Sequence, residues 1–436
     1  MKTSQSNPHV VIIGAGPAGL ATAKAMLDAG FTVSVFEKNN DVGGIWNPAA
    51  ENSPMYNSAH FIASIGLWTS HFEGFPFPPG TPHYPSNLQV FNYLKSFAEA
   101  ENLYKYIEFD TQVTNISPIG QNRWQIEASS RTFEADVVIV CSGTLWTPVT
   151  PHFPGEFDGS VRHAQTYKDP SEFEGKNVLI VGCGNSGVDI ACDAARTAKS
   201  TYLSMRRGYW FFPKFVMGQP LSEFFASDED KPEWMAGLDF PKLLELVAGD
   251  PSKFGLPRPD HAPLASHPIM NSEILHHFGH GRISPRGEIE KLDGRKVLFE
   301  SGEVDQIDEI ICATGYQTDL PFLADNLVEM NGGTRPDLLM TAFHPSAANL
   351  YFNGMIETNG GVFGLFSKLA NLLASIIAAR AEGRLSDAEL SRMVTEADAI
   401  SKTPGKIQSA RHVGYVDTAL LVKAMMNFQS QLHPKA

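Results

Sequence analysis

This 436-residue sequence has only four cysteines and a deficit of positive charge. The cysteines form no CxxC pair and lie in apolar, strand-like or helix-like stretches, so we expect buried thiols in a reducing cytoplasm rather than disulfides or metal ligands. Lysine and arginine total 34 against 48 aspartates and glutamates, which gives a net charge of −14. That charge would repel nucleic acids and anionic membranes, so we expect neither as a partner, and small molecules fit better.

Long apolar runs and a secretory signal are also missing. The first residues, MKTSQSNPHV, lack the basic start and apolar core of a signal peptide. The most apolar later run, around Leu369 to Ala379, is too short to cross a bilayer. We therefore expect a soluble protein, and 43% hydrophobic residues are enough to build cores in two to four domains.

Two stretches of the chain have the strand–helix–strand pattern of a nucleotide-binding fold. Each begins with a strand rich in Val and Ile that runs into a glycine turn, at His9 to Gly14 and at Asn177 to Gly182, and continues as a helix and a second strand. A third strand of this kind runs from Glu309 to Gly315. The pattern predicts an α/β protein with parallel sheets and two nucleotide folds.

Both glycine turns carry the fingerprint GxGxxG. Backbone N–H groups and the helix N-terminus at such a turn hold a pyrophosphate. After the first fingerprint, Glu37 closes the next strand, where its carboxylate would accept hydrogen bonds from ribose hydroxyls. The glycines are Gly14, Gly16 and Gly19 in the first turn and Gly182, Gly184 and Gly187 in the second.

The strand after the second fingerprint ends differently, in Ser204, Arg206 and Arg207, where a site for NAD would have an acidic residue. A guanidinium makes bidentate, charge-assisted hydrogen bonds to the 2′-phosphate of NADP. We therefore favour NADPH over NADH for this site. The alternative, that both arginines are solvated surface residues, stays open.

A third motif resembles that of a known family. The segment FDGSVRHAQTY, from Phe157 to Tyr167, is similar to the FxGxxxHxxxY signature of class B flavin-containing monooxygenases. The resemblance extends through both fingerprints, CSGTLWTP, the LSxR segment and ATGY at Ala313 to Tyr316, and so covers most of the chain. The related signature of Baeyer–Villiger monooxygenases ends in Trp, so Tyr167 favours the branch that oxygenates nitrogen and sulfur.

The resemblance implies a fold and a reaction. It implies two nested Rossmann-like domains, with an FAD domain at residues 1–173 and 306–436 that is interrupted by an NADP domain at 174–305. In this family NADPH reduces FAD, and O2 then forms a C4a-(hydro)peroxyflavin that transfers one oxygen atom to a soft nitrogen or sulfur nucleophile. The expected partners are a small amine, sulfide or heteroaromatic substrate and O2, and the expected assembly is a homodimer.

The resemblance also assigns roles to individual residues, and His163 becomes a structural and gating element rather than a base. FAD contacts fall on Gly14, Gly16, Pro17, Ala18, Gly19, Glu37, Lys38, Gly44, Ile45, Trp46, Val113 and Asn359. NADPH contacts fall on Gly182, Gly184, Asn185, Ser186, Gly187, Ser204, Arg206 and Arg207, and Thr314 and Gly315 lie where the chain returns to the FAD domain.

One departure from the family concerns the group beside the flavin. The family usually places an asparagine there, between the GGxW turn and the FPxP segment. Here the aligned stretch has Ile62, Ala63 or Ser64, with His60 close by. His60 and Ser64 are the candidates to replace the amide in stabilising the oxygen adduct. If neither does, either the adduct is lost as hydrogen peroxide, or NADP⁺ and backbone groups stabilise it.

Other interpretations stay open or are disfavoured. A Baeyer–Villiger oxygenase and a non-catalytic FAD- and NADPH-binding redox sensor are alternatives, whereas a flavin disulfide reductase would need a cysteine pair that is missing. His276, His277 and His280 have no second ligand cluster, so we expect no metal. The aromatic run Tyr209 to Phe212 is more typical of core packing than of a substrate path.

Overall fold

In a computed structural model, the chain divides into two compact units. The structure describes residues 7–120, 122–226, 235, 238–324, 327–331, 335–402 and 415–432. Unit 1 contains Met1–Ser53, Ile65–Thr147 and Gln317–Ala436, and unit 2 contains Pro54–Ser64 and Pro148–Tyr316. Unit 2 is thus wider than the predicted NADP domain at 174–305 and takes in a distant segment, Pro54–Ser64, which we call the inserted segment.

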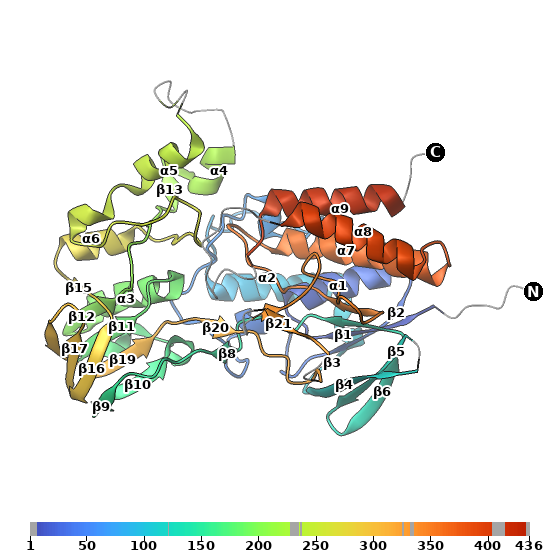
Figure 1. Ribbon diagram of the computed structural model, residues 1–436, viewed down its shortest axis with the longest axis horizontal. Helices are drawn as coiled ribbons and strands as arrows, with labels where there is room; N and C mark the ends of the chain where they lie inside the picture. The colour runs from blue at the N-terminus through green and yellow to red at the C-terminus, as the bar shows by residue number, and fades with distance from the viewer. Residues whose placement is uncertain are drawn as a thin grey trace, which may run out of the picture. The chain divides into compact units, whose positions relative to one another are not determined.

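Unit 1 is built on a five-stranded parallel sheet in the order β23-β7-β1-β2-β3. In Figure 1, α1 and α7 to α9 lie on one side of this sheet, and an antiparallel sheet of β4, β5 and β6 lies on the other. The parallel strands are β1 (His9–Ile13), β2 (Thr32–Phe36), β3 (Ile107–Glu108), β7 (Val137–Val140) and β23 (Leu350–Phe352). The antiparallel strands are β4 (Val113–Ile119), β5 (Arg123–Ala128) and β6 (Arg131–Ala135).

The helices of unit 1 follow from local sequence signals. Ser86 and Ser386 cap α2 and α8 with full capping boxes, in which Gln89 and Glu389 return the hydrogen bond. Pro17 occupies the first turn of α1, where its missing N–H costs nothing. The helices are α1 (Pro17–Asp28), α2 (Asn87–Ala100), α7 (Phe363–Ala381), α8 (Asp387–Ser401) and α9 (Thr418–Leu432), with short 3-10 turns η1 (Gly44–Trp46), η2 (Trp68–Ser70) and η3 (Leu103–Tyr106).

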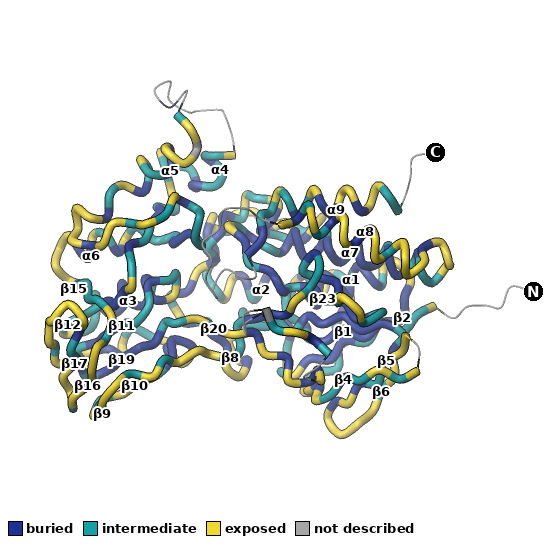
Figure 2. Tube along the Cα trace, viewed as in Figure 1, coloured by how far each residue is buried: buried dark blue, intermediate teal, exposed yellow. Residues whose placement is uncertain are grey.

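Helix α7 corrects one expectation from the sequence. It runs for 19 residues with a mean hydropathy of 1.3, so by length and composition alone it could cross a membrane, and the apolar run is not too short. Its most apolar window is 72% buried inside the protein, and α7 packs against α1 and α9. Figure 2 shows α7 and the parallel strands as buried. Most of the helix surface forms the core of unit 1, and the polar residues Lys368, Asn371 and Ser375 follow one partly exposed stripe.

Unit 2 has its own five-stranded parallel sheet, in the order β10-β19-β11-β12-β15. Helix α3 packs on one face (Figure 1), and a four-stranded sheet in the order β18-β17-β16-β9 packs on the other through Leu292, Val297 and Phe299. The parallel strands are β10 (Ser160–His163), β11 (Asn177–Val181), β12 (Ser200–Ser204), β15 (Ile283–Arg286) and β19 (Glu309–Cys312). The second sheet contains β9 (Gly155–Phe157), β16 (Ile289–Gly294), β17 (Lys296–Phe299) and β18 (Val304–Gln306).

The pairing of β9 and β10 explains why unit 2 begins before residue 174. Strand β10 pairs with β19, and β9 pairs with β16, so both strands belong to unit 2. The described residues between Gly208 and His280, a stretch predicted to be irregular, include the short helices α4, α5 and α6 and the two-residue strands β13 and β14. The remaining elements of unit 2 are α3 (Asn185–Thr197), α4 (Leu221–Ala226), α5 (Phe240–Ala248), α6 (Glu273–Gly279), β13 (Phe215–Val216), β14 (Gln219–Pro220), η4 (Ala164–Thr166), η5 (Pro170–Phe173) and η7 (Pro251–Phe254).

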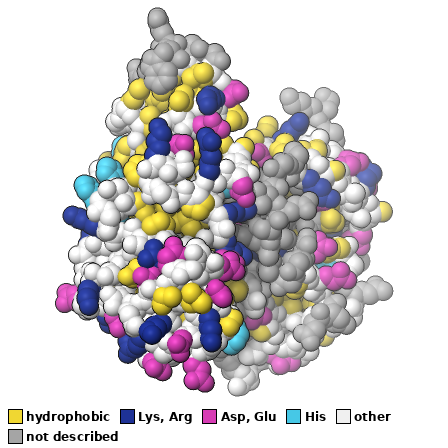
Figure 3. Space-filling view, turned by 60° about the vertical axis from the view of Figure 1, so that its left-hand side comes forward, with side chains coloured by type: hydrophobic (Ala, Val, Ile, Leu, Met, Phe, Trp, Pro, Cys, Tyr) yellow, Lys and Arg dark blue, Asp and Glu magenta, His cyan; other side chains and the backbone are white. Residues whose placement is uncertain are grey.

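Both predicted strand–helix–strand patterns are confirmed. In unit 1 they are β1, α1 and β2, and in unit 2 they are β11, α3 and β12; the third predicted strand is β19. Two-residue strands β8 (Thr147–Pro148) and β20 (Tyr316–Gln317) lie where the chain passes between units, and β21 (Met330–Asn331) pairs with β22 (Arg335–Pro336). Basic and acidic side chains are interspersed on the face shown in Figure 3, so the net negative charge is not gathered there into one patch.

Candidate active site

The first fingerprint forms a tight turn between β1 and α1. Gly14 has φ +101°, and a Cβ there would lie 2.8 Å from the carbonyl oxygen of Cys141. A Cβ on Gly19 would lie only 1.9 Å from the carbonyl oxygen of Gly14. By contrast, the nearest atom to a Cβ on Gly16 would be 3.5 Å away. The protein itself therefore requires glycine at positions 14 and 19, whereas at Gly16 the need arises only if a ligand approaches the backbone.

The start of α1 is open to an anion. Its N-cap is Gly16, which has no side chain to accept hydrogen bonds from the first-turn N–H groups, and Pro17 follows it. Unsatisfied N–H groups at a helix N-terminus carry a partial positive charge and bind phosphate well. The turn is thus shaped to receive a phosphate.

Glu37 is fixed beside this turn. Its side chain is 4% exposed; Oε2 accepts from the Ala15 N–H at 2.7 Å, and Oε1 accepts from the Asn39 N–H at 2.9 Å. These bonds hold the carboxylate at the carboxyl end of β2, next to β1. Oε1 also accepts from the Asn39 side-chain amide at 2.7 Å, so Oε2 is the oxygen with a lone pair left to accept from a ribose hydroxyl.

A cavity of about 420 Å³ opens at this edge of the sheet, lined by residues of unit 1 alone. The predicted contacts that line it are Gly14, Gly16, Pro17, Ala18, Glu37, Lys38, Gly44, Ile45, Trp46 and Val113. The described lining omits Gly19, which packs against Gly14, and Asn359, which is exposed. Ten of the residues expected around one ligand therefore come together around one cavity.

Unit 2 repeats the construction of the first turn. Gly182 has φ +107°, and a Cβ on Gly187 would lie 2.0 Å from the Gly182 carbonyl oxygen. Gly184 caps α3 without a side chain, which leaves the first-turn N–H groups open to an anion. The side chain of Asn185 has a different role, because it donates to Pro268 O at 2.9 Å and accepts from Met270 N–H at 2.9 Å, and so holds that loop. Ser186 is exposed in the first turn of α3.

The residues at the end of β12 and just after it differ in how available they are to a ligand. The buried Ser204 hydroxyl donates to Gly287 O at 2.8 Å. The Arg206 side chain is 81% exposed, and its Nε lies 3.7 Å from Glu288. The guanidinium of Arg207 lies 5.7 Å from the ring centre of Tyr209. Arg206 is therefore the cation most accessible to a phosphate in solution.

His163 is held in one tautomer. Its Nδ1 accepts from the Gln165 N–H at 3.1 Å, which makes Nε2 the protonated nitrogen that donates to Gly315 O at 3.1 Å. Burial lowers the pKa of His163 below its usual value. Since both ring nitrogens are occupied, the imidazole holds the backbone at Gly315 and is not placed to abstract a proton. Thr314, the preceding residue, donates its hydroxyl to Val149 O at 2.5 Å.

His60 and Ser64 both lie in the inserted segment and belong to unit 2. His60 is exposed, and its Nδ1 contacts Ser58 O at 2.8 Å. Ser64 is fully buried, and its hydroxyl donates to the carboxylate of Glu223 in α4. Of the two predicted substitutes for the missing amide, only Ser64 is sheltered from water.

Comparison with known proteins places the chain in a family. A family model described as "FMO-like: Flavin-binding monooxygenase-like" matches residues 7–377. Human "Flavin-containing monooxygenase 5" is 30% identical over 439 residues, which cover 94% of this chain and 81% of that protein. This chain belongs to the flavin-binding monooxygenase-like family. As a flavin-containing monooxygenase it is an oxidoreductase that depends on NADPH and O2.

Solved structures agree on the α/β fold of this monooxygenase. A structure of "S-allyl-L-cysteine S-oxygenase from Allium sativum" matches with a TM-score of 0.68 at 20% identity, covering 97% of this chain and 89% of that one. A structure titled "Oxidized steroid monooxygenase bound to NADP" matches with a TM-score of 0.72 at 18% identity and covers 98% of both chains. At these identities the structures establish the fold alone.

Sequence reasoning missed part of the cavity wall of this monooxygenase. Ser142 lies two residues after the end of β7 and lines the cavity, and in the described structure its buried hydroxyl has no hydrogen-bond partner. Trp146 donates to Ser142 O at 2.6 Å, and the Lys38 ammonium lies 4.3 Å from the centre of its indole ring. The signal was available, because ligands of open parallel sheets bind beyond the carboxyl ends of adjacent strands. The Ser142 hydroxyl is buried without a partner in the described structure, and Gly16 in the same cavity is needed only if a ligand approaches its backbone. Both observations fit a bound dinucleotide.

Two secondary interpretations are settled by burial. All four cysteines are free and buried, as predicted. Phe211 and Phe212 are each 1% exposed and belong to core clusters, which supports core packing for the aromatic run. Within the described residues, no group of three or more His, Cys, Asp and Glu side chains is placed to hold a metal, and His277 contacts Glu273 in its own helix.

The contrast between Gly16 and Gly19 gives a first prediction. Gly16→Val should fold with near wild-type stability but lose the flavin, since a Cβ at this position meets no protein atom closer than 3.5 Å and the side chain would block a ligand. Gly19→Ala should lower the free energy of unfolding of the flavin-free protein by about 1–3 kcal/mol or more, because its Cβ meets backbone. Flavin absorbance after gel filtration and denaturant unfolding of the apoprotein measure the two effects. A marked loss of apoprotein stability in Gly16→Val would contradict this division.

The environment of His163 gives a second prediction. Because its pKa is lower in the folded protein than the usual 6.5, the unfolded chain binds more protons between the two values. The His163 contribution to stability is therefore full above pH 6.5 and is lost as the pH falls from 6.5 toward the folded pKa. His163→Gln should show a shallower loss of stability between pH 7.5 and pH 5.5 than the wild type, measured by urea unfolding. Equal slopes in both proteins would show that other groups carry the pH dependence.

Proposed function

We propose that this monooxygenase binds FAD in the cavity of unit 1 and NADPH at the second fingerprint in unit 2, and that it transfers one oxygen atom from O2 to a soft nitrogen or sulfur nucleophile. The observation that carries the proposal is the repeated turn. In each unit, two glycines of the turn are required because a Cβ there would collide with a backbone carbonyl oxygen. The helix that follows has a glycine as its N-cap, so no side chain blocks an anion from its first-turn N–H groups. Two such turns provide two dinucleotide sites. The proposed architecture is a pair of nested Rossmann-like domains.

The residues around the unit 1 cavity have distinct tasks in holding FAD. The first-turn N–H groups of α1 bind the pyrophosphate, and Glu37 accepts from the ribose. The backbone of Val113 contacts the adenine, and the Ser142 hydroxyl gains a partner that the described protein does not supply. Bound FAD supplies the redox chemistry, since it accepts a hydride from NADPH and activates O2. The protein's part is to position and shelter it.

The second site separates NADPH from NADH through charge. The first-turn N–H groups of α3 bind the pyrophosphate of the nicotinamide cofactor, and Arg206 pairs with the 2′-phosphate. Arg206 is exposed and its contact with Glu288 is long, so it is free to turn to a phosphate. His163 holds Gly315 next to the point where the chain leaves unit 2, which fits a gating role for this histidine.

Protection of the activated oxygen falls to the inserted segment in this proposal. The buried Ser64 is the first candidate to replace the family's asparagine, and its single hydroxyl proton would have to turn from Glu223 to the oxygen adduct. The exposed His60 is the second candidate. A site that excludes water and offers fixed donors prevents the loss of oxygen as hydrogen peroxide. Both residues act by holding polar atoms in place, and no covalent bond to the substrate is needed.

Tyr167 supports N- and S-oxygenation over Baeyer–Villiger chemistry. It ends the motif that begins at Phe157, where the Baeyer–Villiger signature ends in Trp. The buried free thiols suit a reducing cytoplasm, which is the location we propose, and we propose a homodimer as the assembly.

A cofactor and substrate panel tests the proposal. The purified protein should be yellow, and its flavin spectrum should bleach anaerobically on addition of NADPH. NADPH oxidation and O2 uptake should then rise with a tertiary amine or a sulfide and not with a cyclic ketone. Ketone-dependent ester formation would replace the proposal with Baeyer–Villiger chemistry, and NADPH binding without sustained O2 uptake would indicate a redox sensor. A colourless protein that FAD cannot reconstitute would overturn the central assignment.

Arg206 provides a sharper test of the second site. Arg206→Ala should lower kcat/KM for NADPH about ten- to a hundredfold and change that for NADH little, since a charged hydrogen bond contributes roughly 1.5–3 kcal/mol. Arg207→Ala serves as the matched control, because its guanidinium already lies near Tyr209. An unchanged NADPH preference in the double variant would show that other groups recognise the phosphate.

A further inference from the structure

Two aspartates one turn apart on α3 face the inserted segment. Asp189 and Asp193 are an i, i+4 pair, so their side chains lie on the same side of the helix. They stand about 6 Å and 12 Å along the helix axis from Asn185, where α3 begins, at 1.5 Å per residue. Asp193 is 3% exposed, and burial raises the pKa of Asp189 above its usual value. Two neighbouring carboxylates in such a place need donors around them.

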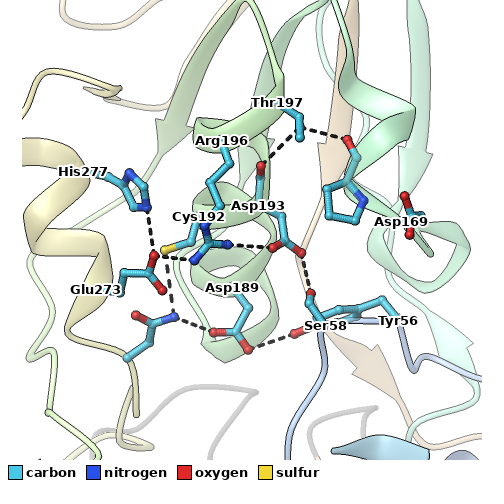
Figure 4. Close-up of polar contacts among 12 residues, drawn as sticks. Tyr56, Ser58, Asp169, Asp189, Cys192, Asp193, Arg196, Thr197, Glu273 and His277 are labelled. Atoms are coloured by element: carbon cyan, nitrogen blue, oxygen red, sulfur yellow. Dashed lines mark hydrogen bonds and ion pairs between the residues drawn. The ribbon is translucent and has the colours of Figure 1, made fainter.

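Both carboxylates receive hydroxyl donors from the inserted segment, as Figure 4 shows. The Tyr56 hydroxyl donates to Asp189 at 2.9 Å, and the Ser58 hydroxyl donates to Asp193. Asp193 also accepts from the hydroxyl of Tyr167, the last residue of the FxGxxxHxxxY motif, at 2.9 Å. A single helix face thus binds the inserted segment and the end of that motif together.

The two carboxylates also accept hydrogen bonds from residues outside the inserted segment. Asn271 donates to Asp189 at 2.7 Å, and Arg196 pairs with Asp193 at 3.0 Å while also pairing with Glu273 (Figure 4). Each carboxylate therefore has one donor from the inserted segment and at least one from the rest of unit 2. The hydrogen bonds are directed, so they fix the position of the segment as well as its attachment.

The inserted segment is also tied to the residues that follow Tyr167. The Asn57 N–H donates to Lys168 O at 2.9 Å, and its side-chain amide donates to Asp169 at 2.9 Å. In return, the Lys168 ammonium donates to Met55 O at 2.9 Å. Met55, Tyr56, Asn57 and Ser58 are thus each bonded to α3 or to residues 168–169. If α3 moves, the segment has to follow it or break the bonds of Tyr56 and Ser58.

We propose that Asp189 and Asp193 are positioning residues that couple occupation of the dinucleotide site at the N-terminus of α3 to the order of the inserted segment, which carries His60 and Ser64. This proposal rests on the proposed function for the α3 site. A cofactor that binds the first turn orders the whole short helix, and the two carboxylates pass that order to Tyr56 and Ser58. The segment would then shelter the reacting oxygen only while the nicotinamide cofactor is bound.

Amide hydrogen exchange tests the coupling without measuring activity. In the FAD-bound wild type, saturating NADP⁺ should slow exchange in peptides covering residues 55–62 by about tenfold. This is the slowing expected if the closed form of the segment is stabilised by as much as one or two hydrogen bonds contribute. Tyr56→Phe and Ser58→Ala should each reduce this slowing, and the double variant should abolish it, although NADP⁺ still binds. Ser58→Thr, which keeps the hydroxyl, should behave like the wild type.

A matched control removes a tyrosine hydroxyl elsewhere. Tyr351→Phe in unit 1 deletes a buried hydroxyl that accepts from Arg380 at 3.0 Å and has no bond to the inserted segment. It should leave the NADP⁺-dependent slowing intact. A second readout is the hydrogen peroxide formed per NADPH consumed, which should rise several-fold in the Tyr56→Phe, Ser58→Ala double variant while the rate of flavin reduction by NADPH stays the same.

The outcomes separate this proposal from the one on which it rests. If NADP⁺ does not bind the wild type, as followed by quenching of tryptophan fluorescence, the assignment of the α3 site fails. If NADP⁺ binds but exchange in residues 55–62 does not change, or changes equally in the double variant, the coupling is refuted and the assignment of the site survives.

Discussion

The close approach of a glycine to a carbonyl oxygen in each unit is the constraint on which both sites depend. At Gly19 and Gly187 a Cβ would lie 1.9 Å and 2.0 Å from the carbonyl oxygen of the turn before the helix, so any other residue would push the helix away from its strand. With glycine present, each helix starts directly above the end of the first strand, and its free N–H groups point to the carboxyl edge of the sheet. The helices α1 and α3 therefore create the same kind of opening from one local rule.

Local rules of this type are what a single sequence reveals. The two strand–helix–strand patterns, the glycine turns and Glu37 were predicted because each depends on residues within about 20 positions of one another. Ten of the predicted FAD contacts line one cavity for the same reason. The position of Asn359 depended on alignment rather than on a local pattern, and the structure leaves it exposed.

Contacts between distant parts of the chain could not be predicted in this way. The bonds from Tyr56 to Asp189 and from Ser58 to Asp193 join positions 133 and 135 residues apart, and neither end has a periodicity or motif that marks the other. The orphaned hydroxyl of Ser142 is recognisable only when its surroundings are known to lack a partner. Helix α7 shows the converse, because an apolar composition is the same for a core helix and a membrane helix, and only its neighbours distinguish them.

The inserted segment limits how far unit 2 can be treated as a module. The chain enters unit 2 for eleven residues at Pro54–Ser64, leaves it, and returns for Pro148–Tyr316. A contiguous excision of residues 148–316 would therefore keep the whole parallel sheet and yet remove one hydroxyl donor from each of Asp189 and Asp193. Buried carboxylates that lose donors are destabilising. Transplanting this unit into another protein, or permuting the chain around it, therefore requires that the inserted segment be included with it.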